Sequence, residues 1–76
     1  MASKKAQIRM FVEECETHSS RMHNASIEGH RLAAMALLRR EPEAALSSRV
    51  FAGDIEEVSR LLEKSARLLR DYADTL

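Results

Sequence analysis

The segment from Asp54 to Leu76 carries the feature that most constrains the fold, a long apolar stripe at helical spacing. Its members repeat at alternating intervals of three and four residues, which places them on one side of an α-helix. They are Ile55, Val58, Leu62, Ser65, Leu69, Tyr72 and Leu76, and the leucines Leu61 and Leu68 widen the stripe. Asp54, followed three residues later by Glu57, has the form of a helix N-cap with its reciprocal partner. A stripe wider than a two-stranded seam predicts a terminal helix that packs against two neighbours in a globular bundle.

The first forty residues predict two further helices. The same spacing recurs at Ile8, Phe11, Cys15, His18, Met22 and Ala25, which predicts a first helix from about Ser3 to about Met22. Asn24 can adopt the left-handed conformation that ends a helix. Asn24 or Ser26 can then cap a second helix, which runs to about Arg40. Because residues 32–38 are apolar on all sides, this second helix is either the central element of the fold or the seam of a dimer.

Pro42 separates this region from the terminal helix. The residue before a proline is biased away from helical angles, and proline itself suits the first position of a helix. We therefore expect a break at Pro42 and a short helix that ends at Gly53, in preference to one long helix kinked at the proline.

The predicted fold is all-α, because the chain has only two glycines and one proline and is rich in good helix formers. It is a single helical domain over residues 1–76. We expect a small helical bundle of three long helices plus a short helix around 42–52, and a dimeric bundle remains an open alternative.

The charges argue against nucleic acid as a partner. Twelve basic and twelve acidic side chains give no net charge, whereas dedicated nucleic-acid binders carry a strong basic excess. A local basic patch is conceivable at Arg31, Arg39, Arg40 and Arg49, but a solvated face with favourable charge at a helix C-terminus is the preferred interpretation. A helix-turn-helix over residues 41–64 would present an acidic first turn to phosphate, which disfavours DNA.

Cysteine content and hydropathy favour a soluble, cytoplasmic protein without a membrane partner. A single cysteine, Cys15, excludes an intramolecular disulfide framework. The longest apolar run, 32–38, is far shorter than the roughly 18 residues that span a bilayer. The first residues are not followed by a signal-peptide core. Export by a route that needs no such signal remains open.

The sharpest chemical candidate is a group of zinc-type ligands, namely Glu14, Cys15, His18, His23 and His30. Cys15 and His18 share a helical face, and His30 would approach the same end of the bundle if the first two helices packed antiparallel. Cys15, His18 and His30 are therefore a candidate site for zinc or another divalent metal. Since zinc motifs normally supply two closely spaced pairs, we favour Cys15 as a small core residue and no cofactor.

Catalytic interpretations are weaker. A cysteine nucleophile at Cys15 with His18 as its base lacks an orienting third group and an oxyanion donor. The carboxylates Glu13, Glu14 and Glu16 are better explained as a solvated face. No catalytic residue is predicted.

The sequence thus predicts a non-enzymatic helical module for protein–protein interaction, such as an adaptor, a regulator or a co-chaperone. It would act through helix–helix packing, either with a protein partner or as a homodimer. The predicted partner interface consists of Leu32, Met35, Leu37, Leu38, Leu61 and Leu68. The alternative is a small metal- or ligand-binding bundle that uses Cys15, His18 and His30.

Overall fold

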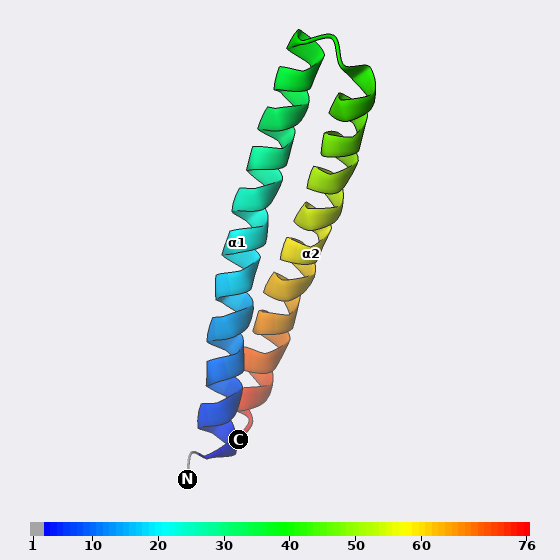
Figure 1. Cartoon of the computed structure of the whole chain (residues 1–76). Coiled ribbons are helices and arrows are strands. Elements are labelled where there is room, and N and C mark those ends of the chain that lie inside the picture. The colour runs from blue at the N-terminus through cyan, green and yellow to red at the C-terminus, as the bar shows by residue number, and fades with distance from the viewer. Residues whose placement is uncertain (1–2) are drawn as a thin grey trace.

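The computed structural model describes residues 3–76, and these form a long helical hairpin (Figure 1). Helix α1 spans Lys4–Leu38 and helix α2 spans Pro42–Asp74, and a short turn at 39–41 joins them. The helices run side by side in opposite directions, so the first turn of α1 lies beside the last turn of α2. The hairpin measures 56 × 18 × 11 Å. The predicted all-α class is confirmed, but the predicted three long helices with a short fourth helix around 42–52 are wrong.

Helix α1 continues through the break predicted near Met22 and Asn24. Asn24 and the serines before it are indifferent helix formers, but each costs only a few tenths of a kcal/mol in a helix interior. Ser26, one of the two candidate caps in the prediction, is instead 2% exposed and packs toward α2. Tertiary packing on this side of the helix outweighs the weak local stop signal.

Helix α2 likewise continues through Gly53 and Asp54, which the prediction treated as a stop and a start. A glycine that ends a helix usually takes a positive φ, and neither described glycine does so. Gly53 in a helix interior costs about 1 kcal/mol relative to alanine. The neighbouring Ala52 is completely buried against α1, and this packing holds the helix together across the glycine.

The break at Pro42 is confirmed, and a kinked continuous helix is excluded. Arg40 adopts a left-handed φ of 60°, although glycine or asparagine is usual at such a position. The Glu41 N–H donates to the Ala36 carbonyl at 2.9 Å, and the Arg40 N–H donates to the Leu37 carbonyl at 3.1 Å. This pair of bonds is a Schellman motif, which satisfies the last carbonyls of α1. Pro42 then begins α2, where its missing N–H is not needed.

The two helices meet along a seam with the spacing of a two-stranded coiled coil. Positions at alternating intervals of four and three residues are buried or half-buried in both helices. In α1 they are Ile8, Val12, Cys15, Ser19, Met22, Ser26, Gly29, Ala33 and Ala36. In α2 they are Ala45, Ser48, Ala52, Ile55, Ser59, Leu62, Ala66, Leu69 and Ala73. We call these residues the seam.

Small side chains dominate the seam and bring the helices close together. Every seventh residue of α2 from Ala45 to Ala73 is alanine or serine, and all five are buried. A Cβ atom added at Gly29 would lie only 2.9 Å from the Ala52 Cβ, so glycine is needed there. At mid-length, the Ser19 hydroxyl donates to the Ser59 carbonyl at 2.9 Å and the Ser59 hydroxyl donates to the Ser19 carbonyl at 2.8 Å. These contacts fix the register, with Ser19 level with Ser59.

The stripe predicted in α2 is therefore displaced from the true contact. Ile55, Leu62 and Leu69 belong to the seam but are only half-buried, whereas Val58 and Tyr72 are exposed. Within the described residues α2 packs against α1 alone, so the chain itself supplies one neighbour and not the two expected within a three-helix bundle. Seven of the ten large apolar side chains of α2 are consequently exposed.

The two glycines provide a matched test of the seam. Gly53→Ala should raise the free energy of unfolding by about 0.5–1 kcal/mol, because alanine is the better helix former and nothing lies within 4 Å of the new Cβ. Gly29→Ala gains the same propensity but forces α1 and α2 apart at Ala52, and we expect a net loss of about 1 kcal/mol. Urea unfolding followed by circular dichroism measures both values. Equal stabilisation by the two substitutions would contradict the close contact at Gly29.

Candidate protein-interaction face

The seam divides the hairpin surface into two long faces of different character. In an antiparallel pair of helices, the positions that flank the seam on one side of α1 lie beside the equivalent positions of α2. On one side these positions are mostly charged, and an ion pair between Glu16 and Arg70 bridges the two helices there. We call this side the polar face. Its flanking residues are Arg9, Glu16, His23, His30, Arg49, Glu56, Glu63 and Arg70.

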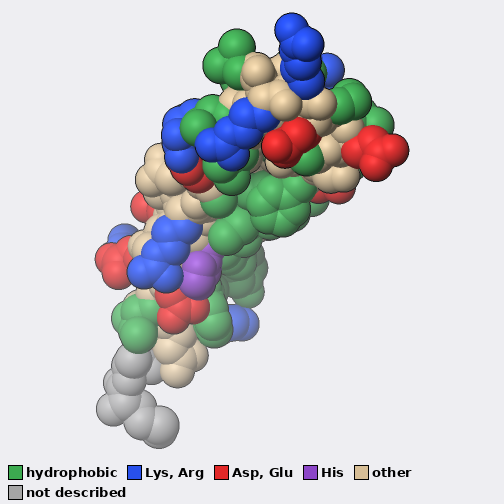
Figure 2. Space-filling model, turned by 45° about the horizontal axis from the view of Figure 1, so that its top comes forward, with side chains coloured by type: hydrophobic (Ala, Val, Ile, Leu, Met, Phe, Trp, Pro, Cys, Tyr) green, Lys and Arg blue, Asp and Glu red, His purple; other side chains and the backbone are tan. Residues whose placement is uncertain are grey.

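The opposite side is rich in large apolar side chains, and we call it the apolar face. It comprises Phe11 and Leu32 from α1, and Phe51, Val58, Leu61, Leu68 and Tyr72 from α2. All seven side chains are exposed, from 43% for Val58 to 61% for Leu68. Figure 2 shows hydrophobic side chains gathered in a strip down the middle and right of the view, with charged side chains mainly to its left and above it.

A hollow and a side-chain contact show that both helices contribute to the apolar face. Near the turn, an open hollow of about 410 Å³ is lined by side chains of both helices, including Ala25 and Leu32 from α1 and Phe51 from α2. At the other end of the hairpin, the Lys4 ammonium lies 5.7 Å from the centre of the Tyr72 ring. The face therefore extends along nearly the whole hairpin.

The six residues predicted as a partner interface fall into two groups. Leu32, Leu61 and Leu68 lie on the apolar face and are exposed. Met35 is half-buried beside that face, whereas Leu37 lines a separate hollow near Pro42 and Leu38 is 85% exposed at the end of α1. The prediction missed four members of the face, namely Phe11, Phe51, Val58 and Tyr72. Phe51, Val58 and Tyr72 share one signal, because each immediately precedes a member of the seven-residue repeat of alanine and serine in α2.

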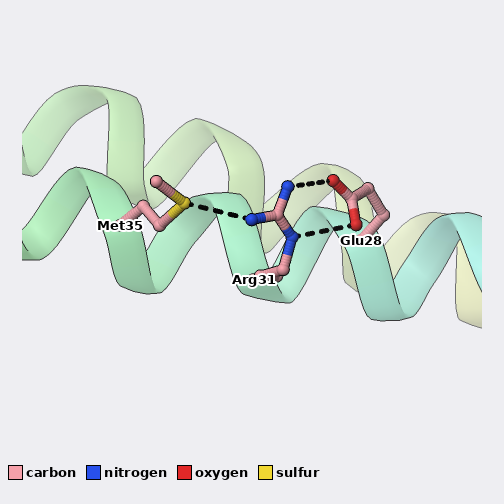
Figure 3. A network of polar contacts seen from close by, with 3 residues as sticks. All are labelled: Glu28, Arg31 and Met35. Carbon is pink, nitrogen blue, oxygen red and sulfur yellow. Dashed lines mark hydrogen bonds and ion pairs between the residues drawn. The ribbon is translucent and has the colours of Figure 1, made fainter.

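A polar network borders the apolar face on the outer side of α1 (Figure 3). The Arg31 guanidinium donates to the Glu28 carboxylate at 3.0 Å and to the Met35 sulfur at 3.2 Å. The hydrogen bond from Arg31 lowers the pKa of the Glu28 carboxyl, and the same bond raises the pKa of Arg31. Glu28, which also lines the hollow, therefore has its charge compensated within its own helix.

The candidate metal ligands are not brought together. Cys15 and His18 lie on the same side of α1, with Cys15 half-buried and His18 exposed. Because α1 is continuous, His30 lies 15 residues farther along the same helix, roughly 22 Å from Cys15 at about 1.5 Å per residue. His30 also flanks the polar face. Across residues 3–76, no group of three or more His, Cys, Asp and Glu side chains is placed to hold a metal ion.

Neither of the described helices has a stretch long and apolar enough to cross a membrane. No protein-family model matches the chain, and neither a curated protein nor a solved structure shows significant similarity to it.

The distance between Cys15 and His30 generates a prediction about zinc. Zinc ligands lie about 2.0–2.3 Å from the ion, so two residues roughly 22 Å apart cannot share one. We expect Cys15→Ala and His30→Ala to have no common effect on zinc binding, measured by native mass spectrometry at equimolar zinc. Loss of one bound zinc ion from both variants would contradict the continuous α1, and His23→Ala provides the control for a surface histidine.

Proposed function

We propose that this protein is a non-enzymatic protein–protein interaction module that works by helix packing on its apolar face. The observation that supports the proposal is the position of seven large apolar side chains outside the seam, on one side of the hairpin. Proteins that act as monomers rarely expose contiguous apolar patches larger than a few hundred Å². A face that runs along most of a 56 Å hairpin exceeds that size, which indicates that another protein covers it.

The energetics of the face favour a helical partner. Each of the seven side chains leaves roughly half of its surface in water, and covering that half is worth about 1 kcal/mol for a leucine or phenylalanine. The sum of about 7 kcal/mol can offset the entropic cost of association. Because five of the seven exposed side chains recur along α2 at helical spacing, the best complement is an amphipathic helix lying along the hairpin.

The proposal includes a cytoplasmic setting, in which the thiol of the lone Cys15 stays reduced. Cys15 is half-buried in the seam, so its role here is packing. The module would then act as an adaptor, a regulator or a co-chaperone whose specificity resides in the apolar face and its charged borders.

Neighbouring residues of α2 allow a matched cross-linking test. Leu68 lies on the apolar face, whereas Arg67 lines a hollow on the polar face. A photoreactive benzoylphenylalanine at position 68, expressed in the native cell, should form a cross-linked product with another chain, because that side chain would be covered by the partner. The same probe at position 67 should give several-fold less product.

Gel electrophoresis and mass spectrometry of the products measure the outcome. Equal cross-linking from positions 67 and 68, or none from position 68, would refute an interaction through the apolar face. Circular dichroism of both labelled proteins serves as the control that the hairpin has folded.

A further inference from the structure

The borders of the apolar face carry charges that the chain leaves unpaired. Glu14 and Arg21 lie on the outer border along α1, and Glu57 and Lys64 lie on the outer border along α2. All four side chains are exposed. Among the ion pairs within residues 3–76, none involves these four residues. A partner that lies on the apolar face would meet them directly.

The register of the hairpin places these charges at matching heights. Ser19 and Ser59 lie level, joined by their reciprocal hydrogen bonds. Glu14 lies five residues before Ser19, and Lys64 lies five residues after Ser59, so these two are level in an antiparallel pair. By the same argument, Arg21 is level with Glu57. Within this set of four, each acid thus has a base at its own height on the other helix, across the width of the face.

We propose that the occupant of the apolar face is a second copy of this chain, paired about a twofold axis parallel to the long axis of the hairpin. The inference rests on the proposed function and names its partner. Such an axis leaves every height unchanged and places α1 of one copy against α2 of the other. Glu14 then meets Lys64 of the second copy, and Arg21 meets Glu57 of the second copy. Symmetry repeats both pairs, so four ion pairs border a four-helix bundle.

The remaining charges on the borders are also accommodated. Asp54 is level with Asn24, and Asp71 is level with Gln7, so each of these carboxylates meets an amide that can donate a hydrogen bond. Glu28 has no base at its height on α2, but Arg31 already compensates its charge within α1. No acid on these borders lies opposite an acid of the second copy.

The opposite arrangement, with the two turns at opposite ends, is disfavoured by charge. Its twofold axis crosses the hairpin at mid-height and places α1 against α1 and α2 against α2. Arg21 lies at the middle of Lys4–Leu38, and Glu57 lies next to the middle of Pro42–Asp74. Each would therefore face its own copy, which places like charges together at the centre of the interface.

Shape and size agree with the parallel axis. Phe51 stands at the height of residue 27 of α1, within the span of the hollow between Ala25 and Leu32. In the proposed dimer, Phe51 of each copy faces the hollow of the other. The broad side of the hairpin projects about 56 by 18 Å, roughly 1,000 Å², so it is large enough to contain the approximately 800 Å² that a stable interface takes from each partner.

Charge reversal tests the pairing in solution. Sedimentation equilibrium of the full chain should show a dimer of two 8.6 kDa chains. Lys64→Glu should raise the dimer dissociation constant about tenfold or more, because each substitution turns two attractions into repulsions. Glu14→Lys combined with Lys64→Glu should return the constant to within about threefold of the original value. Arg67→Glu, on the polar face, is the control and should leave it unchanged. A monomer at 100 µM, or a double variant as weak as Lys64→Glu, would overturn the proposal.

A distance measurement tests the direction of the axis. Spin labels at Glu41→Cys, in a chain that also carries Cys15→Ser, mark the turn of each copy. With both turns at one end, electron resonance should report a separation well below half of the 56 Å hairpin length. A separation near the full length would overturn the parallel axis.

The cross-linking experiment at position 68 distinguishes a failure of self-pairing from a failure of the proposed function. A product of two identical chains supports self-pairing. A product with a different protein alone upholds the proposed function and overturns self-pairing, and the absence of any product overturns both.

Discussion

The close approach of α1 and α2 along the seam determines the rest of the structure. Alanine and serine recur at every seventh position of α2, and Gly29 in α1 lies against Ala52 where no Cβ would fit. Because small residues form most of the contact, the backbones approach closely and leave little room for large side chains between them. Both phenylalanines and most leucines therefore lie outside the seam, where they are exposed. The apolar face is thus a direct consequence of how the hairpin packs.

The same seam explains which features could be predicted from sequence. The all-α class follows from composition, and the break at Pro42 follows from one residue whose ring and missing N–H act strongly and locally. The helix ends predicted at Asn24, Gly53 and Asp54 are wrong because each of these local signals is worth at most about 1 kcal/mol. Packing along the whole hairpin outweighs such signals. The helices therefore continue where local chemistry alone would end them.

The candidate face was only partly predictable for a related reason. Leu61 and Leu68 were assigned to a partner interface because they widen an apolar stripe, but Val58 and Tyr72 were assigned to the buried core of that stripe. Hydrophobicity gives alanine and serine little weight, so the repeat from Ala45 to Ala73 is overshadowed by the bulky residues beside it. Only a search for small residues at intervals of seven identifies the true contact. The metal interpretation depended on a break near Asn24, and the continuous α1 removes the proximity of Cys15 and His30.

A seam of small side chains also limits the stability of the isolated hairpin. Within the described residues no large side chain is fully buried, and the core consists mostly of alanine with two serines. Each alanine contributes far less burial than a leucine would, while ordering two long helices costs about as much backbone entropy as in any fold. A partner that binds only the folded hairpin adds its binding free energy to the stability of the fold. In the proposed complex, folding and recognition would thus be coupled, because the large apolar side chains that could stabilise the hairpin stay exposed until a partner covers them.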